Sequence, residues 1–412
     1  MAEDRPSVST LARIAAKDPE NLQLHADKIV HLEFLAGESA HHILFREVKF
    51  PNLETLVLDA SDLNDDESIE PYLQPSLTRL IFYGGPISDV SLEKLQNACP
   101  QLEELQIDNP RDLISPEGFL RFLDGAKSLK HLTVIYGMDR AITDSVFVAL
   151  AVKPGIETLQ FQLPITADLV SKAVDEQTRA GAQDQLFPQL RKVVCVGEPD
   201  GLLMLLPHFP QLTYLEASVM HSNDPSADVR DLLPDINANC LNLCTLKLEY
   251  LGEDSVHISS QTLVELAQGL GKLEELDISG DNIFTEGFDD SHFSRIVQVL
   301  PRLKVLQLSF TCDLTEASLV EAAKNCGMSL IDLEIGGSYD LQKLTKAGLR
   351  FPELQSLELG KLVPPSVPAG ALATEAVGIA RLLRDIAPNL EEFDVMSANS
   401  FSDMVENELD KM

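Results

Sequence analysis

A short apolar phrase recurs along almost the whole chain and constrains its fold more than any other feature. The phrase is Leu-x-x-Leu-x-Leu, in which another apolar residue replaces leucine at some positions. Successive phrases begin 22 to 36 residues apart, so the 412 residues form repeated units that each need neighbours to bury their apolar side. The phrases begin at Ile29, Leu53, Leu77, Leu102, Leu129, Ile156, Leu190, Leu212, Leu243, Leu273, Leu303, Leu330, Leu354 and Leu390.

Each unit contains a strand pattern followed by a helix pattern. In the second unit, Leu56 and Leu58 alternate with outward residues at the two-residue period of a strand. Between the phrases, apolar residues recur at helical spacing, for example in segments 91–99, 118–123 and 262–267. We therefore expect the strand leucines to point into a core, the residues between them to face solvent, and the helices to form an outer layer.

Start and stop signals bracket these expected helices. Ser88, Ser115 and Thr143 stand at expected helix starts, where a side-chain oxygen accepts hydrogen bonds from first-turn amides. Proline cannot continue a helix, so the x-Pro-x-Leu sequences mark helix ends. These corners are Phe50-Pro51, Cys99-Pro100, Phe187-Pro188, Phe209-Pro210, Leu300-Pro301, Phe351-Pro352 and Ala387-Pro388.

The six cysteines are scattered and include no Cys-x-x-Cys pair. This spacing suggests neither a zinc site nor a disulfide framework, and reduced thiols in the cytosol or nucleus are expected. Cys99, Cys240 and Cys326 occupy the corner before a strand, where we predict that they fill the core as small hydrophobic side chains.

The units resemble leucine-rich repeats of the cysteine-containing class, typical of F-box/leucine-rich-repeat proteins, and their irregular lengths resemble those of filamentous fungi. The Pro-x-Leu-x-x-Leu-x-Leu phrase, followed by an Ile-Thr-Asp-like turn at 87–89, 142–144 and 314–316, carries the resemblance. It implies an α/β leucine-rich-repeat solenoid of about fourteen repeats. Such a ribonuclease-inhibitor-like horseshoe has a parallel sheet on its concave side and helices on its convex side.

Three regions are expected along the chain: an N-terminal cap over residues 1–28, the solenoid over 29–396, and an acidic C-terminal tail or cap over 397–412. In the family that the repeats resemble, an N-terminal F-box joins the protein to a ubiquitin-ligase scaffold. No F-box is recognisable in residues 1–28, which lack the Leu-Pro opening of that module. The segment is therefore interpreted as a cap over the first apolar edge of the solenoid.

The charge balance limits the kinds of partner. Sixty-five acidic against 32 basic residues give a formal net charge of −33, which favours basic partners and disfavours direct binding to nucleic acid or to an anionic membrane. No apolar stretch approaches the ~20 residues of a membrane span, and no secretory leader is recognised. A cytoplasmic or nuclear protein is expected, monomeric outside its complex.

Common enzyme signatures are absent from the sequence. It contains no Walker-type phosphate loop, dinucleotide fingerprint, His-Glu-x-x-His or Gly-x-Ser-x-Gly motif. His41 and His42, with His31, lack further ligands at metal spacing and are interpreted as part of a solvated loop. The Gly336-Gly337-Ser338 run is predicted to be an ordinary turn rather than a phosphate cradle. We expect no catalysis and no cofactor.

The outward positions of the expected strands form the predicted binding surface. Acids dominate the last seven strands, where Lys247 is the base, whereas the first seven strands are mixed and offer apolar and aromatic contact. A concave acidic surface would attract lysine or arginine of a partner, although the same acids also serve solubility. The predicted contact residues are Tyr83, Ile81, Ile135, Glu216, Glu249, Glu275, Asp277, Asp332, Glu334, Glu358, Glu392 and Asp394.

Over-long units are a second feature that suggests binding, since additions to a repeat emerge as rim loops. The loops expected here span 167–185, 220–239 and 362–374, and each is equally compatible with a neutral insertion. Taken together, the sequence favours a non-catalytic scaffold that binds a protein client. The alternatives are a substrate receptor in a ubiquitin-ligase pathway and an escort for a strongly basic client such as a ribosomal protein or histone.

Overall fold

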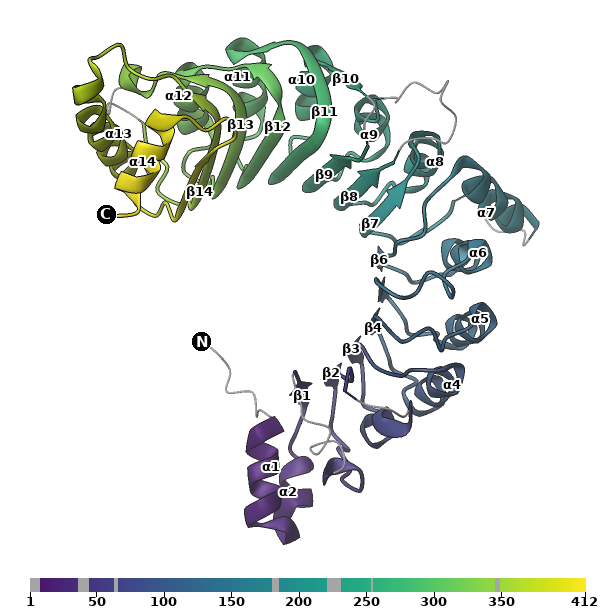
Figure 1. Cartoon of the computed structure of the whole chain (residues 1–412). Coiled ribbons are helices and arrows are strands. Elements are labelled where there is room, and N and C mark those ends of the chain that lie inside the picture. Colours follow the sequence, from purple (N-terminus) through teal and green to yellow (C-terminus); the bar gives the residue numbers. More distant parts are fainter. Residues whose placement is uncertain are drawn as a thin grey trace. The chain divides into compact units, whose positions relative to one another are not determined.

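The computed structural model describes residues 8–35, 44–62, 66–179, 185–220, 231–252, 255–344 and 349–412. The chain divides into two compact units, Met1–Val196 and Gly197–Met412. Each unit is an α/β leucine-rich-repeat solenoid in which strands line the inner side and helices lie on the outer side (Figure 1). The expected fold class is confirmed. His41 and His42 lie outside the described residues.

The first unit opens with two short helices and then alternates strands with helical connections. Its strands are β1 (His31–Phe34), β2 (Thr55–Asp59), β3 (Arg79–Tyr83), β4 (Glu104–Asp108), β5 (His131–Val134), β6 (Thr158–Gln160) and β7 (Lys192–Gly197). Its helices are α1 (Val8–Lys17), η1 (Pro19–Asn21), α2 (Leu22–Ala26), η2 (Asp66–Tyr72), α4 (Asp89–Ala98), α5 (Pro116–Gly125), α6 (Asp144–Val152) and α7 (Ala167–Arg179).

The second unit repeats the pattern with longer strands. Its strands are β8 (Tyr214–Val219), β9 (Thr245–Tyr250), β10 (Val256–Ser259), β11 (Glu275–Asp289), β12 (Val305–Asp313), β13 (Asp332–Tyr339), β14 (Ser356–Leu362) and β15 (Glu392–Val395). Its helices are α8 (Pro199–Leu205), η3 (Leu206–His208), α9 (Leu233–Asn239), α10 (Ser260–Gly269), α11 (Asp290–Val299), α12 (Glu316–Asn325), η4 (Leu341–Lys343), η5 (Ala369–Ala371), α13 (Leu372–Ile386) and α14 (Ser400–Leu409).

Every apolar phrase of the sequence is followed, two residues after its start, by a strand. Within each unit these strands pair in parallel with the strands of the neighbouring repeats. β10 has no counterpart in the sequence prediction and pairs in parallel with the far half of β11. The two-residue period of the sequence therefore located the strands of the repeats. The additional strand, β10, forms where β11 continues beyond its own repeat.

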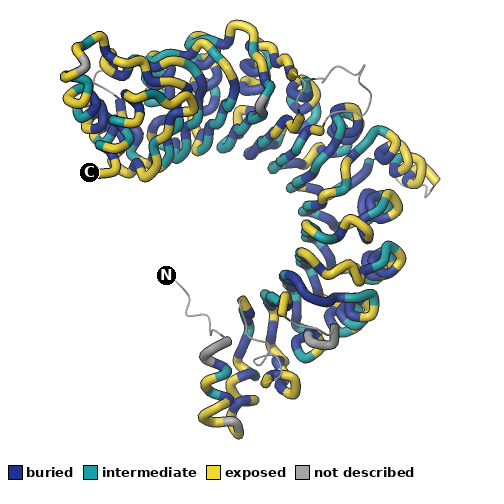
Figure 2. The backbone as a smooth tube through the Cα atoms, in the orientation of Figure 1, coloured by how far each residue is buried: buried dark blue, intermediate teal, exposed yellow. Residues whose placement is uncertain are grey.

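The second residue of the strands forms an inward ladder that holds the repeats together. The members are buried except the half-buried Phe393, and buried segments recur from repeat to repeat along the tube in Figure 2. Stacking of such ladders lets each repeat bury its apolar side against its neighbours. In the second unit the aligned residues are Leu215, Leu246, Leu276, Leu306, Leu333, Leu357 and Phe393.

The expected N-caps are present at all three helix starts. Ser88 precedes α4 in a capping box, and the Ser115 hydroxyl accepts a hydrogen bond from the Gly118 amide at the start of α5. Thr143 stands at the start of α6 in extended conformation, but its side chain accepts no capping bond there. The prediction of the helix starts is thus confirmed, and the capping bond itself is confirmed for the two serines.

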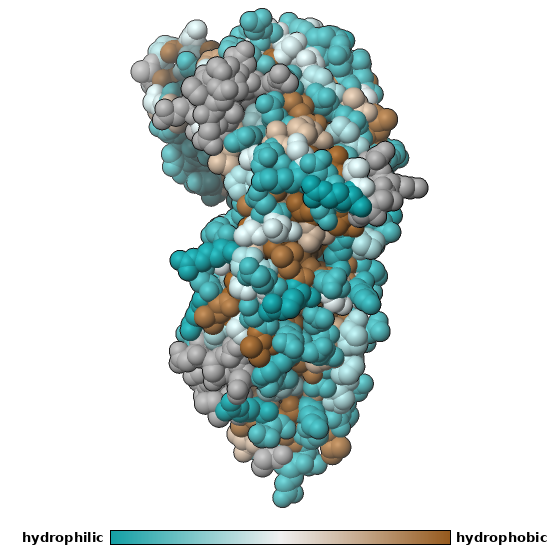
Figure 3. All heavy atoms as spheres, turned by 90° about the vertical axis from the view of Figure 1, so that its right-hand side faces the viewer, coloured by the Kyte–Doolittle hydropathy of each residue, from teal (hydrophilic) through white to brown (hydrophobic). Residues whose placement is uncertain are grey.

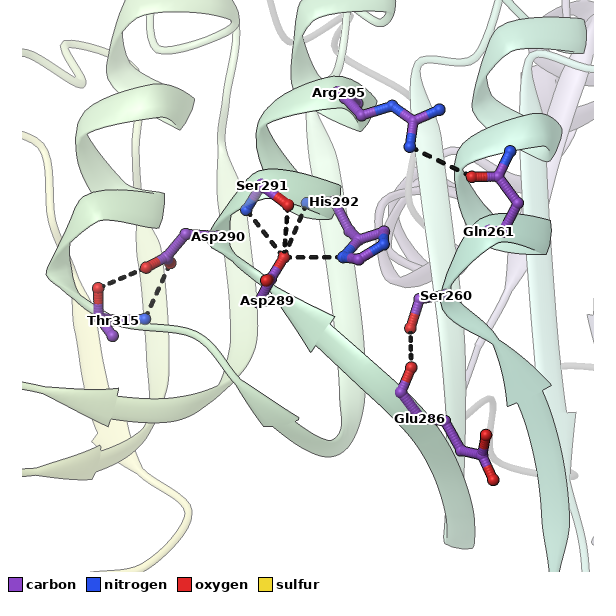
Figure 4. A network of polar contacts seen from close by, with 9 residues as sticks. All are labelled: Ser260, Gln261, Glu286, Asp289, Asp290, Ser291, His292, Arg295 and Thr315. Carbon is purple, nitrogen blue, oxygen red and sulfur yellow. Dashed lines mark hydrogen bonds and ion pairs between the residues drawn. The ribbon is translucent and has the colours of Figure 1, made fainter.

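Carboxylates at helix starts also tie neighbouring repeats together. Asp289 caps α11, and the next residue, Asp290, accepts hydrogen bonds from the Thr315 amide at 3.0 Å and the Thr315 hydroxyl at 2.6 Å (Figure 4). Asp89 does the same for Ser115, at 2.8 and 2.6 Å. Because Thr315 and Ser115 are themselves N-caps, each carboxylate fixes the start of the following helix.

The three corner cysteines lie in the core, as predicted, and are 3%, 0% and 2% exposed at Cys99, Cys240 and Cys326. Burial raises the thiol pKa to about 11 for Cys99 and to about 12 for the other two. Since only the thiolate reacts, a pKa about two units higher lowers the reactive fraction roughly 100-fold.

We expect iodoacetamide to label these three thiols at least ~100-fold more slowly than the half-buried Cys244 in the native protein near neutral pH. Peptide mass spectrometry of timed reactions measures the rates, and the same reaction in denaturant supplies the control. Equal native rates at Cys240 and Cys244 would contradict the core assignment.

The predicted loops require correction where the structure describes them. Most of segment 167–185 is the helix α7, and the end of segment 220–239 is the helix α9. Segment 362–374 combines the end of β14, an irregular stretch, η5 and the start of α13. The predicted turn at Gly336-Gly337-Ser338 lies inside β13, because the strand continues through glycines that allow the neighbouring backbone to approach closely.

Helices are also present in both regions expected to form caps. α1 and α2 precede β1, and α14 follows β15 and contacts α13. The assignment of residues 1–28 and 397–412 as caps stays a prediction. Within the described ranges, every helix is too short or too polar to cross a bilayer.

Candidate functional site

The outward side chains of the second unit form an acidic surface on its strands. Parallel pairing aligns the middle outward residues of neighbouring strands, so that their side chains share one row. The row runs Glu216, Lys247, Asp277, Gln307, Glu334, Glu358 and Asp394. We call the nine predicted acids of this unit the acidic strand face: Glu216, Glu249, Glu275, Asp277, Asp332, Glu334, Glu358, Glu392 and Asp394.

Three carboxylates of this row lie on consecutive strands with no base between them. Glu334 is directly opposite Glu358, and Glu358 is directly opposite Asp394. Glu334 and Glu358 are half-buried, whereas Asp394 is exposed. Like charges in directly opposed strand positions destabilise a sheet. This arrangement therefore costs the unit stability when all three groups are ionised.

Several of the acids have hydrogen-bonding partners on the same surface. The Tyr214 hydroxyl donates to Glu216 at 2.5 Å, and the Ser218 hydroxyl donates to Glu249 at 3.0 Å. Ser309 donates to Glu334. These neutral donors orient the carboxylates and leave their negative charge uncompensated.

Two further carboxylates have partners of different kinds. The Gln307 amide donates to Asp332 at 2.9 Å and, like the hydroxyls, leaves the charge in place. Glu275 instead lies 3.5 Å from the ammonium group of Lys247. Sequence reasoning identified the acids but missed their neutral donors, although the donors also occupy outward strand positions and could have been found from the same alternation.

Burial and mutual repulsion raise the carboxyl pKa values on this surface. The pKa of Asp277 rises to about 6, mainly because the group is desolvated, with Glu334 and Glu249 adding to the effect and Ser279 and Lys247 opposing it. One oxygen of Asp277, Oδ1, is buried without a hydrogen-bond partner in the described structure. The pKa of Glu358 is raised by burial and by the charges of Glu334, Asp394 and Asp332.

Replacing Asp277 with asparagine should stabilise the second unit near pH 7. A folded-state pKa above the unfolded value near 3.9 makes ionised Asp277 unfavourable, and this cost appears as the pH rises from about 4 through 6. We expect the Asp277→Asn variant to unfold roughly 2–4 °C higher than the wild type near pH 7, the shift that 1 kcal/mol produces in a unit of this size.

The difference between the two proteins should shrink toward pH 4 and disappear near pH 3, where the wild-type carboxyl is protonated in both states. Thermal unfolding followed by circular dichroism across this pH range measures it. If the wild type is as stable as the Asp277→Asn variant near pH 7, or more stable, the ionised Asp277 carboxylate carries no cost in the folded protein and the prediction is contradicted.

One predicted contact residue of the first unit, Ile81, is more deeply buried than expected. Ile81 is only 7% exposed, because its strand is flanked in register by Val57 and Gln106. It therefore offers little apolar area to a partner. The burial pattern of β3 does not alternate at this point, because three consecutive residues, 80–82, are buried.

The other two predicted contact residues of the first unit, Tyr83 and Ile135, lie on either side of the end of β4. Tyr83 pairs in register with Asp108, Ile135 follows β5 on the other side of β4, and both are half-buried. The next residue, Tyr136, is 64% exposed and was missed because it follows the strand rather than alternating within it. The first unit thus presents a small aromatic and aliphatic group at one edge of its sheet.

A hollow of about 550 Å³ lies between α6 and α7 on the helix side of the first unit. The charged residues beside it pair with one another: Lys172 lies 2.7 Å from Asp144 and 2.6 Å from Asp168, and Arg179 lies 3.2 Å from Glu176. The face seen in Figure 3 is mostly hydrophilic, with apolar residues in small separate patches. These features favour the strand side over the helix side for a charged partner.

In the described parts of the chain, no group of three or more His, Cys, Asp or Glu side chains has an arrangement that could hold a metal ion. The crowded carboxylates of the acidic strand face are spread along a row rather than converging on one point. Their arrangement suits an extended ligand with several positive charges.

Comparison with known proteins gives likenesses of fold. No family model and no curated protein matches the chain. A chain of the yeast Rad7 and Elc1 complex is similar, at 15% identity over 95% of this chain and 88% of that chain, with a TM-score of 0.41. The leucine-rich repeat-containing protein LegL7 from Legionella pneumophila is similar at 12% identity over 86% and 96%, with a TM-score of 0.36. A chain of the TLR13–ssRNA13 complex is similar at 15% identity over 90% and 52%, with a TM-score of 0.40.

Proposed function

We propose that this protein is a non-catalytic interaction scaffold that binds a basic segment of a protein client on the acidic strand face. The observation that carries the proposal is the row Glu334, Glu358 and Asp394, in which like charges are directly opposed across three strands. A bound segment bearing lysine or arginine would relieve that repulsion, so the binding energy and the stability of the unit are coupled.

The burial of the acids supports the same proposal. A carboxylate held in a half-buried position with a raised pKa is costly in the free protein, and such groups cluster at functional sites. Solubility alone is served equally well by fully exposed acids, which cost no desolvation. The half-buried acids are therefore better explained by a cationic ligand.

Two kinds of client are compatible with binding at the acidic strand face. A strongly basic client would make the protein an escort for molecules such as a ribosomal protein or histone. The resemblance of the repeats to those of F-box proteins gives the alternative of a substrate receptor in a ubiquitin-ligase pathway. Both uses fit a monomer in the cytoplasm or nucleus, and one experiment distinguishes them.

The experiment is affinity purification from the source cell with two baits, the wild type and a variant in which Asp277, Glu334, Glu358 and Asp394 are changed to lysine. We expect basic proteins to be recovered with the wild type and lost with the variant. Recovery of ligase scaffold subunits would support the ubiquitin alternative. Identical sets of partners from both baits would refute the proposal that the acidic strand face binds the client.

A further inference from the structure

A hollow of about 540 Å³ opens on the strand side of the second unit, beside the acidic strand face. It lies where β12, β13 and β14 continue beyond their middle outward residues. Glu334 and Lys361 both line the hollow, with Ser309, Phe310 and Met396 also among the lining residues. The hollow thus contains both a negative and a positive side chain.

Two glycines are among the residues that line the hollow. A Cβ atom at Gly336 would lie 2.3 Å from the Phe310 carbonyl oxygen, and one at Gly360 would lie 2.4 Å from the Gly337 amide nitrogen. Neither position can hold a side chain without moving the neighbouring backbone. The neighbouring strands therefore pack closely at these two glycines, both of which are buried.

The two charged residues lie on neighbouring strands. Lys361 is three residues beyond Glu358, which is directly opposite Glu334, so about 10 Å of strand separates the backbone positions of Glu358 and Lys361. Lys361 is exposed and makes no ion pair with the described residues. Glu334 accepts a hydrogen bond from Ser309, which leaves its charge in place. A ligand that pairs with both must carry a cation and an anion.

The wall of the hollow indicates that the connecting chain is aliphatic. Met396, 39% exposed, is among the lining residues and provides apolar surface, whereas Phe310 is buried. A flexible thioether suits a methylene chain of variable position. In an extended arginine residue the guanidinium lies roughly 7 Å from the α-carboxylate, by ordinary bond lengths. Such a residue carries both a cation and an anion, and each can make a charge-assisted hydrogen bond with a side chain of opposite charge.

We propose that this hollow binds the carboxyl-terminal arginine of a client, with the guanidinium on Glu334 and the terminal carboxylate on Lys361. The inference rests on the proposed function and deepens it, because it specifies which part of the basic client is held. An arginine within a chain would leave Lys361 without a partner. A carboxyl-terminal lysine offers a point charge in place of the planar fork that matches a carboxylate, so it should bind more weakly than arginine.

The test uses a short basic peptide labelled at its amino terminus and ending in arginine with a free carboxylate. Fluorescence anisotropy compares it with the same peptide amidated at its end and with the same peptide ending in alanine. We expect each change to weaken binding by at least about tenfold, the loss of one charge-assisted contact. The Lys361→Met variant should bind the free and amidated peptides equally, and Glu334→Gln should bind the arginine and alanine peptides equally.

The matched control is Lys272→Met, which removes another exposed lysine of the same unit and should retain the full preference. Equal binding of all three peptides by the wild type would overturn the inference. If Glu358→Lys still weakens the binding of all three peptides in that case, the proposed function stands and only the chain-end inference fails. If Glu358→Lys has no effect on their binding, the proposed function fails as well. Free L-arginine that competes as strongly as the peptide would assign the hollow to the amino acid and overturn the chain-end inference.

Discussion

Reversing two carboxylates of the acidic strand face, Glu358→Lys with Asp394→Lys, should weaken the binding of a short lysine-rich peptide at least about 100-fold at ~0.1 M salt, where the Debye length is about 10 Å. A unit-charge pair separated by 4 Å in water interacts by about 1 kcal/mol, and each reversal removes one attraction and adds one repulsion. Two reversals therefore change the binding free energy by roughly 3–4 kcal/mol, and every 1.4 kcal/mol is about tenfold in affinity. Fluorescence anisotropy of the labelled peptide measures the dissociation constant.

A second double variant, Glu265→Lys with Glu353→Lys, is the matched control, because it makes the same change in net charge. Both residues are exposed, Glu265 on the helix α10 and Glu353 in the connection before β14. We expect it to weaken binding by less than about fivefold, since screening reduces the influence of distant charges to little beyond 10 Å. Equal losses in the two variants would mean that only the net charge of the protein matters.

Truncation of Phe288 should produce the largest loss of stability among single changes near the site. Phe288 is 0% exposed, and its ring packs edge-on against Phe310 at 5.8 Å and stacks with His292 at 6.2 Å. Removing a buried aromatic ring typically costs 3–5 kcal/mol, because the transfer energy is lost and a cavity remains. The Phe288→Ala variant should therefore unfold about 6–20 °C below the wild type.

Phe284, on the same strand, supplies the comparison for this variant. It is 45% exposed and stacks with His257 at 5.8 Å. Its truncation should cost less than about 1 kcal/mol, as is usual for surface substitutions that leave no cavity. Differential scanning calorimetry of the two variants tests the assignment, and similar unfolding temperatures for both would show that Phe288 is not a core residue.

The fold could be predicted from the sequence because one physical pattern is repeated along the chain. Strand alternation at Leu56 and Leu58, followed by helical spacing and a proline corner, determines which side of each element is buried. Repetition then removes the ambiguity that a single short strand would have. β10 was not predicted, because it has no phrase of its own and forms against the far half of β11.

The acidic strand face could be predicted for the same reason, since outward residues are identified by alternation once the strands are located. Alternation does not predict how deeply an outward side chain is covered, as the burial of Ile81 between neighbouring strands illustrates. It also fails where the register shifts after Ile335, and the hollow with Lys361 lies beyond that point. Contacts of this kind depend on the path of the backbone rather than on the period of the sequence.

Zero-length crosslinking of a bound lysine-rich peptide tests most directly whether the acidic strand face is the binding surface. A carbodiimide joins a lysine amine to a carboxylate that it touches, and mass spectrometry of the digested product identifies the acid. We predict crosslinks concentrated at Glu334, Glu358 and Asp394 and their loss at high salt. Crosslinks distributed equally over helix-side acids such as Glu265 would contradict the account.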